Sequence, residues 1–349
     1  MEGYRKALTV WYNHAKRDLP WRDSPEPYHI WVSEVILQQT RVQQGTEYYH
    51  NFLRLFPDVR SLANAPEEEV LKAWQGLGYY SRARNMHHAA KTIQSTYNGS
   101  FPADYISIKK LKGIGDYTAA AIASIAFGLP YAVVDGNVYR VLSRLFGITT
   151  AIDSNAGKQE FYRLAQLLLD PGKPGDSNQA LMELGAIQCL PSRPLCPGCP
   201  FLTECIAHTN QSVDQFPVKS KKTKVKERYL NFIYLHDESK LFLEKRGNRD
   251  IWRNLFQFPI IETIGPSTPE GVTGSKEWEE LFNNSSIDIE HAYPEKIHLL
   301  THQRLHIRFF SVKLKGNGLP VHYIEVEKIE IEKYPVPKPI ERFLTEIAY

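Results

Sequence analysis

The sequence predicts two domains of different class, an all-helical domain over residues 1–211 and an α+β domain over residues 229–349. Apolar residues recur at helical spacing in the first part, as they do along 138–145. In the second part they alternate with a period of two, as along 305–309. The stretch 212–228 between them is rich in lysine and shows no helical stripe. It is therefore expected to be a basic linker.

Composition excludes several classes of protein. Hydrophobic residues make up 42% and charged residues 23% of the 349 residues, as in an ordinary globular protein. The net charge is only +3, so any nucleic-acid surface must come from local clusters of basic residues. Charged residues interrupt the N-terminal segment, and no apolar run is long enough to cross a membrane. A cytosolic protein is expected, or a nuclear one if the source is a eukaryote.

Glu34 is the first candidate for chemistry. In a helix, Ile30 and Trp31 would lie one turn before it, and Leu37 and Gln38 one turn after it. These neighbours would desolvate the carboxyl and raise its pKa, which suits a proton donor near neutral pH. A solvated glutamate on a helix surface is the alternative.

The segment 76–83 combines aromatic residues with closely spaced glycines. Core packing is the ordinary role of such an aromatic run. Gly76 and Gly78 favour a turn rather than a helix interior.

A second pair of glycines, Gly113 and Gly115, predicts a tight turn before the alanine-rich helix that starts near residue 119. Such a turn leaves N–H groups free at a helix N-terminus, where a phosphate is favoured. The alternative is a simple connection between two helices.

Asp135 stands immediately before the amphipathic pattern of 138–145 and is expected to cap that helix. The N–H groups of a helix N-terminus favour the ionised carboxylate. An ionised carboxylate can stabilise a positive charge that develops in a reaction, so the capping role and a catalytic role are compatible.

All four cysteines lie within seventeen positions in the spacing C-x6-C-x2-C-x5-C, at Cys189, Cys196, Cys199 and Cys205. Structural zinc usually takes two tight pairs of ligands, and only Cys196 and Cys199 form such a pair. One loop with uneven gaps can supply the four corners of a 4Fe-4S cluster. Zinc and disulfides remain the alternatives.

This cysteine spacing, preceded by the glycine turn some 70 residues earlier, resembles the endonuclease III superfamily of DNA glycosylases. The segments Leu19–Arg22 and Ser33–Thr40 resemble the adenine DNA glycosylases of the MutY type within it. The resemblance implies a helix-hairpin-helix glycosylase domain with a 4Fe-4S cluster loop. It also implies that the hairpin holds one DNA strand by its backbone.

The same resemblance assigns roles to individual residues. Glu34 would protonate the extruded adenine, and Asp135 would stabilise the sugar cation, with Tyr117 and Asn137 positioning it. The residues implied to contact DNA are Gly113, Gly115, Gln39, Thr40, Leu77 and Tyr79, of which Leu77 and Tyr79 would wedge into the duplex. Those implied to contact the flipped adenine are Arg17, Trp21 and Arg22.

Position 117 separates two enzyme types in the superfamily. Bifunctional members carry there a lysine that attacks the sugar and cleaves the strand through a Schiff base. Here the residue is Tyr117, and the nearby Lys109, Lys110 and Lys112 all precede the second glycine. A monofunctional enzyme that leaves an abasic site is expected.

The second domain resembles the Nudix-like recognition domain of the same family. Ile251–Pro259 matches an aromatic strand end of that fold, whereas the glutamate-rich magnesium box is missing from 260–271, which argues against pyrophosphate hydrolysis. A helix is expected after Pro339. The segment Leu300, Thr301 and His302 aligns with a Phe-Ser-His motif by which relatives recognise 8-oxoguanine, with leucine in place of the aromatic residue.

The sequence thus predicts a monomeric adenine DNA glycosylase that binds double-stranded DNA containing A:8-oxoguanine or A:G mispairs. Two other functions are open. One is an endonuclease III-like glycosylase and lyase acting on oxidised pyrimidines, which Tyr117 and the second domain oppose. The other is a non-catalytic iron–sulfur DNA-binding module, which the presence of both carboxylates opposes.

Overall fold

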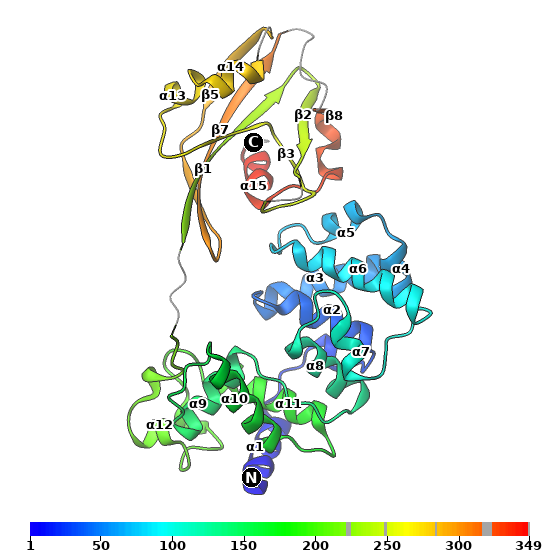
Figure 1. Ribbon diagram of the computed structural model, residues 1–349, viewed down its shortest axis with the longest axis vertical. Coiled ribbons are helices and arrows are strands. Elements are labelled where there is room, and N and C mark those ends of the chain that lie inside the picture. The colour runs from blue at the N-terminus through cyan, green and yellow to red at the C-terminus, as the bar shows by residue number, and fades with distance from the viewer. Residues whose placement is uncertain (221–224, 248–249, 283–284, 316–322, 348–349) are drawn as a thin grey trace. The chain divides into compact units, whose positions relative to one another are not determined.

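The computed structural model describes residues 1–220, 225–247, 250–282, 285–315 and 323–347. Its contacts divide the chain into two compact units (Figure 1). The first unit comprises Met1–Asn64 and Asn85–Lys222, and the second comprises Ala65–Arg84 and Thr223–Tyr349. Lys221, Lys222 and Lys224 of the expected basic linker lie outside the described residues.

The first unit is helical over its described residues. Its α-helices are α1 (Glu2–Ala15), α2 (Pro27–Leu37), α3 (Val42–Leu55), α4 (Val59–Asn64), most of α6 (Ser81–Thr96), α7 (Tyr105–Lys110), α8 (Asp116–Phe127), α9 (Gly136–Phe146), α10 (Asn155–Leu168), α11 (Pro174–Glu183) and α12 (Ile206–Thr209). The unit also contains the short 3₁₀-helices η1 (Pro20–Arg22), η3 (Cys196–Gly198) and η4 (Val213–Gln215) and the π-helix η2 (Leu184–Gln188).

Two helices of this unit form its buried centre. Helix α2 buries residues on nearly every side, among them Trp31 and Ile36, and it packs against the alanine-rich α8. Helix α9 is amphipathic and places the predicted stripe that begins at Val138 into a core shared with Phe161. The expected helical spacing along 138–145 is thereby confirmed.

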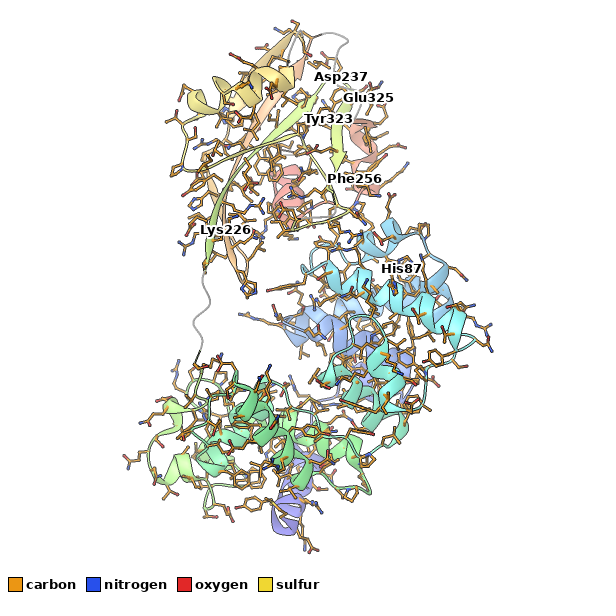
Figure 2. The ribbon with its side chains drawn as sticks, in the orientation of Figure 1. His87, Lys226, Asp237, Phe256, Tyr323 and Glu325 are labelled. Carbon is orange, nitrogen blue, oxygen red and sulfur yellow. The ribbon has the colours of Figure 1, made fainter. Side chains whose placement is uncertain are left out.

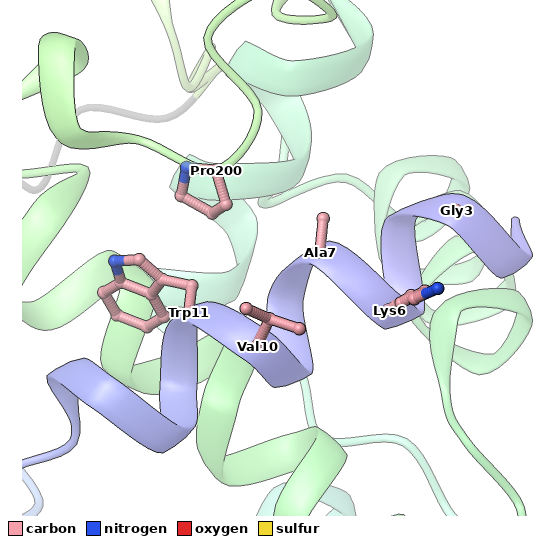
Figure 3. A pocket seen from close by; sticks show the side chains of 6 residues that line it. All are labelled: Gly3, Lys6, Ala7, Val10, Trp11 and Pro200. Atoms are coloured by element: carbon pink, nitrogen blue, oxygen red, sulfur yellow. The ribbon is translucent and has the colours of Figure 1, made fainter.

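Helix α1 lies beside the loop that carries the cysteines. Figure 3 shows Trp11 of α1 and Pro200 of the loop lining a shallow, mostly apolar pocket together with Val10 and Ala7. Arg5 of the same helix donates a hydrogen bond to the carbonyl of Leu167 at the end of α10 (2.8 Å). The N-terminal helix is therefore fixed to the end of the domain that contains the cysteines.

The second unit is built on one mixed sheet. Its strands are β1 (Lys226–His236), β2 (Lys240–Lys245), β3 (Phe256–Gln257), β4 (Ile260–Thr263), β5 (Ile287–Ala292), β6 (Lys296–Leu299), β7 (Gln303–Leu314) and β8 (Ile324–Glu327). The long strands β1 and β7 run parallel at its centre, and all the other pairings are antiparallel. Asp237, labelled in Figure 2, accepts the backbone N–H groups of Ser239 and Lys240 and closes the turn between β1 and β2.

Helices cover both faces of this sheet. Leu230 and Phe232 of β1 face the core that contains α15 (Lys338–Ile347), whereas Ile233 and Leu235 face the core that contains α14 (Lys276–Phe282). Two shorter helices of the C-terminal half are α13 (Pro269–Thr273) and η5 (Lys328–Lys333). The predicted α+β class and the predicted closing helix are confirmed.

The strand begins earlier than the sequence pattern indicated. Lys226 already pairs with the backbone of His302, and Arg228 lies within β1 rather than in a free linker. The Arg228 guanidinium forms ion pairs with Asp250 (2.7 Å) and Glu262 (2.6 Å). Its side chain is almost fully buried because these carboxylates satisfy its charge, so Arg228 is not part of a solvated tether.

The second unit also contains a segment from the helical half of the sequence. Helix α5 (Glu67–Ala73) pairs with the sheet through Glu68 and Lys245 (2.8 Å). After it, the Tyr80 hydroxyl donates to the carbonyl of Val336 (3.3 Å). Residues 65–84, which include the glycine-rich loop 76–80, therefore belong by contact to the same unit as the sheet.

Phe343→Ala is expected to destabilise the second unit by about 3–5 kcal/mol, because it empties a fully packed aromatic site. The Phe343 ring stacks on Phe309 at 4.1 Å and holds α15 on the sheet. Hydrogen exchange of the β1 and β7 amides measures the loss. Thr345→Ala, an exposed change on the same helix, is the control and should cost less than about 0.5 kcal/mol. Equal protection in both variants would mean that α15 does not stabilise the sheet.

Candidate active site

Glu34 lies in the middle of α2, where Ile30 and Trp31 are buried one turn earlier. Burial raises the pKa of its carboxyl to about 7. A hydrogen bond from the Tyr117 hydroxyl acts in the opposite direction, and the charge of Asp135 adds to the rise. At neutral pH, Glu34 therefore holds a proton in a large share of the molecules and can donate it.

Tyr117 is the second residue of α8, directly after the glycine turn. Its hydroxyl lies 3.6 Å from Sδ of Met182 on α11 and also hydrogen-bonds Glu34. Burial and the nearby carboxylates of Glu34 and Asp135 raise the pKa of this phenol well above its ordinary value. Tyr117 is consequently a neutral hydrogen-bond donor in the site.

Asp135 caps α9, as the sequence predicted. Its Oδ1 accepts the backbone N–H of Val138 (2.7 Å), and its Oδ2 accepts Nδ2 of Asn137 (2.8 Å). Burial nevertheless raises the pKa of this carboxyl, although the hydrogen bonds and Arg140 oppose the rise. The structure thus brings together Glu34, Tyr117 and Asp135 from three separate segments of the chain.

A chain of hydrogen bonds runs from this site to the cysteine loop. Oδ1 of Asn137 accepts the Arg140 guanidinium (2.7 Å), and Arg140 also donates to the carbonyls of Gly185 (3.0 Å) and Cys189 (2.8 Å). Gly185 belongs to the π-helix η2, where a Cβ atom would lie 2.5 Å from Cβ of Asn137. Only glycine allows η2 to approach α9 this closely.

The four cysteines line one small cavity of about 30 Å³. Sγ of Cys189 lies 3.4 Å from the Arg144 guanidinium, which also donates to the carbonyl of Pro191 (2.9 Å). Burial raises the pKa of the Cys199 thiol to about 11. Within the described residues, no three His, Cys, Asp or Glu side chains are arranged to hold a single metal ion. Four soft sulfur donors around one cavity suit an iron–sulfur cluster chemically.

Arg17 and Arg22 both bind Glu183, at 2.8 Å and 2.9 Å. The Glu183 side chain is only 2% exposed. Burial alone would raise the pKa of Glu183, but the hydrogen bonds from Arg17 and Arg22 outweigh it and lower that pKa to about 2. Trp21 packs edge-on against Tyr49 instead of joining the two arginines.

Glu183 was missed by the sequence reasoning. It ends α11 and stands immediately before η2, so it lies between the arginines and the cysteine loop. A single glutamate six positions before Cys189 gives little signal in the sequence. Its importance becomes visible only when two arginines from the N-terminal segment bind it.

The hairpin consists of α7, the glycine turn and α8. Gly113 has a φ of +83°, and a Cβ there would lie 2.6 Å from Cβ of Asn85. Gly115 occupies the N-cap of α8 without a side-chain cap. Asp116, next in the chain, forms an ion pair with Lys109 that lowers the pKa of its carboxyl. The predicted helix-hairpin-helix, with α7 and α8 on either side of the glycine turn, is confirmed.

Gln39 and Thr40 follow the end of α2. Gln39 is exposed and has a φ of +62°, which is uncommon for any residue other than glycine. Such backbone conformations occur disproportionately at functional sites.

The second unit contains the other predicted DNA-contacting residues. In loop 76–80, Gly76 and Gly78 have φ values of +94° and +73°, and Tyr79 is 46% exposed. The Tyr79 hydroxyl hydrogen-bonds the Thr301 hydroxyl in the turn between β6 and β7. Leu77, by contrast, is partly buried.

The two neighbours of Thr301 in that turn have different surroundings. Leu300 packs against the core under α15. His302 is exposed. The turn thus presents a hydroxyl and an imidazole, while its leucine helps to fix it to the domain.

Comparisons with known proteins agree with this arrangement. Residues 32–167 match the model of the HhH-GPD superfamily of base excision DNA repair proteins, and residues 231–346 match the NUDIX domain. The adenine DNA glycosylase of Buchnera aphidicola from Schizaphis graminum is 33% identical over 306 residues, which cover 87% of this chain and 86% of the relative. The chain belongs to the adenine DNA glycosylase family.

Other similar proteins fit this membership. Human adenine DNA glycosylase is 45% identical over 221 residues, which cover 61% of this chain and 40% of the human protein. The solved structure of a thermostable thymine-DNA glycosylase is 30% identical, with a TM-score of 0.56, and covers 60% of this chain and 96% of that one. As a member of the adenine DNA glycosylase family, the chain is a base excision repair enzyme acting on N-glycosyl bonds. Among the described helices, none is long and apolar enough to cross a membrane.

Gly185→Ala is expected to slow adenine excision tenfold or more, because the added methyl group pushes Asn137 and hence Asp135 out of position; misplacements of about 1 Å can cost on the order of a hundredfold. Single-turnover excision rates measure the effect. Gly172→Ala is the matched control, since its Cβ would meet only Asp170 at an ordinary distance of 3.4 Å. A normal rate for Gly185→Ala would contradict the coupling of η2 to the active site.

Proposed function

We propose that this enzyme removes adenine mispaired with 8-oxoguanine or guanine and leaves an abasic site. The observation that carries the proposal is that Glu34 and Asp135 both lie near Tyr117. Depurination needs one protonated carboxyl as an acid and one carboxylate that can stabilise positive charge, and Glu34 and the helix-capping Asp135 supply them. The substrate is double-stranded DNA, and the enzyme is expected to act as a monomer. It would work where the chromosome lies, in a bacterial nucleoid or, if the source is a eukaryote, in the nucleus.

Glu34 supplies the proton in this mechanism. It protonates a ring nitrogen of the extruded adenine, so the electron pair of the breaking N-glycosidic bond passes to a neutral base. Asp135 stabilises the positive charge that develops on the sugar. Tyr117 and Asn137 hold the two carboxylates in place through the hydrogen bonds described above. Water then adds to the sugar and gives the abasic site. Because residue 117 is a tyrosine and has no amine, it cannot form a Schiff base with the sugar.

Other residues bind the substrate in this proposal. The hairpin glycines Gly113 and Gly115 receive a phosphate, and Gln39 and Thr40 contact the base left behind. Arg17, Trp21 and Arg22 contact the adenine, and the pairing with Glu183 keeps both guanidinium groups oriented. Tyr79 and Leu77 fill the space that the flipped nucleotide leaves.

Recognition of 8-oxoguanine is assigned to Leu300, Thr301 and His302. The hydrogen bond between Tyr79 and Thr301 supports this assignment. It joins loop 76–80, which would fill the space of the flipped nucleotide, to the turn that would bind the lesion. A hydroxyl and an imidazole can hydrogen-bond the extra polar groups of an oxidised guanine.

Cys189, Cys196, Cys199 and Cys205 would hold a 4Fe-4S cluster. Their donor chemistry and shared cavity fit this group. When bound, the cluster supplies a structural crosslink for the loop. Arg144 and Arg140 hold the backbone of that loop independently, through the carbonyls of Pro191 and Cys189.

Glu34→Gln is expected to lower the single-turnover excision rate by roughly 10²- to 10⁴-fold while mispair binding persists, because glutamine keeps the shape but lacks the proton. For the unchanged enzyme, the rate should fall as the pH rises through about 7, since only protonated Glu34 is active. Strand breaks should appear only after alkali, on A:8-oxoguanine and A:G duplexes. Breaks without alkali would indicate a lyase, and near-normal excision by the variant would exclude Glu34 as the acid.

Thr301→Ala is expected to reduce the preference for A:8-oxoguanine over A:G several-fold while leaving A:G excision close to normal. The change removes the hydroxyl that both the lesion and Tyr79 can use. Excision rates on the two duplexes give the ratio. Thr273→Ala is the control, since among the described residues the Thr273 hydroxyl bonds only the Glu270 carbonyl of its own helix α13. An unchanged ratio would remove Thr301 from lesion recognition.

A further inference from the structure

Met182 lies on α11, which continues through η2 to Cys189, and it contacts Tyr117 of the candidate active site. It is the penultimate residue of α11, next to Glu183. Its side chain packs against the core of α9 and α10 and also against the smaller cluster around Ala120 and Val133. From there its Sδ reaches the Tyr117 hydroxyl at 3.6 Å. A partly buried thioether thus contacts the only phenol that hydrogen-bonds Glu34 among the described residues.

The Tyr117 hydroxyl has one proton and two possible acceptors. One is the Glu34 carboxyl, and the other is the Met182 sulfur, a weak acceptor. An ionised carboxylate is the stronger acceptor and will take the phenol proton. A protonated carboxyl is a poorer acceptor, so the thioether can then receive that proton instead.

We propose that Met182 is a positioning residue which accepts the Tyr117 proton while Glu34 carries its own, and so keeps the acid form of Glu34 available for catalysis. This proposal rests on the proposed role of Glu34 as proton donor. Without the sulfur, the phenol has only the carboxyl to bind. It then stabilises the ionised carboxylate, and Glu34 loses its proton at a lower pH.

The other groups around Glu34 are accounted for. Asp135, before α9, repels the ionised form of Glu34, whereas Tyr117 from α8 favours it. Arg22 on η1, which also packs against α2, is already bound to Glu183, Gln179 and the carbonyl of Arg17. The balance at Glu34 therefore depends on where the Tyr117 proton points.

The test compares Met182→Leu with the unchanged full-length enzyme. Leucine keeps the size of the side chain but cannot accept a hydrogen bond. The alkaline limb of the single-turnover pH profile should move to lower pH by about one pH unit, which makes the variant roughly tenfold slower above both midpoints and equal below them. The sequence has three methionines, so Met86→Leu, at a buried position, is the control and should leave the profile unmoved.

Two further measurements make the outcome decisive. Tyr117→Phe combined with Met182→Leu should titrate like Tyr117→Phe alone, because the effect passes through the hydroxyl. Carbon-13 NMR of labelled glutamate, with the Glu34→Gln spectrum identifying the Glu34 signal, reports the carboxyl titration without catalysis. A failed general-acid role would show as normal excision by Glu34→Gln, whereas a failed Met182 role would show as an unmoved carboxyl titration in Met182→Leu.

A uniform loss of rate at every pH, or an equal shift in the Tyr117→Phe background, would also overturn the proposal, because either result would indicate a packing role. If Met182→Leu does not fold, norleucine incorporated into the Met86→Leu protein replaces the sulfur at position 182 with a methylene of nearly the same shape. The same shift of the Glu34 titration is then expected, and its absence would refute the role of the sulfur.

Discussion

The two hydrogen bonds that Asp135 accepts at the start of α9 organise the catalytic unit. One fixes the first turn of the helix through Val138, and the other orients Asn137. From Asn137, Arg140 carries the arrangement to the carbonyls of Gly185 and Cys189. A single carboxylate is thus the helix cap, the predicted stabiliser of a sugar cation and the first member of a network that ends at a cysteine. Because the contacts are continuous, a shift of the cysteine loop can reach Asp135 through Arg140 and Asn137.

The ionised form of Glu34 destabilises the folded protein, and packing elsewhere in the first unit must offset this cost. Raising the pKa of Glu34 from 4.5 to about 7 means that its ionised form costs the folded state on the order of 3 kcal/mol above neutral pH. In the unfolded chain the Glu34 carboxyl ionises at its ordinary pKa of 4.5. The free energy of unfolding therefore falls as the pH rises from 4.5 to about 7. The interior of α2 and α8 offsets that cost by close packing of Trp31, Ile36 and the alanines of α8. Conversely, Arg17 and Arg22 hold Glu183 ionised, so one unit contains one glutamate whose pKa is raised and one whose pKa is lowered.

Local patterns in the sequence were sufficient where a feature depends on neighbouring residues. The helix at 138–145, the Asp135 cap, the glycine turn and the alternation along β7 all follow from short-range rules, and all are present. Contacts between distant segments could not be predicted in this way. Nothing in the sequence signals that Glu183 binds two arginines more than 150 positions away, or that Met182 meets Tyr117. The start of β1 was also misplaced, because the charge of Arg228 suggests solvent until Asp250 and Glu262 are seen beside it.

For segment 65–84, the sequence pattern predicted helices but not the unit to which they belong. Its helical spacing belongs with the N-terminal domain, yet Glu67 and Glu68 bind Asn254 and Lys245, and Tyr80 binds the backbone of Val336. The loop that ends in Tyr79 is therefore held by the Nudix-like half of the protein rather than by the helices that precede it in the sequence. A wedge fixed to the domain that would read the lesion couples two steps that a glycosylase must coordinate, recognition of the base that stays and extrusion of the base that leaves. In the proposed function, the second domain would therefore contribute to base extrusion through Tyr79 as well as to the choice of the opposite base through Thr301.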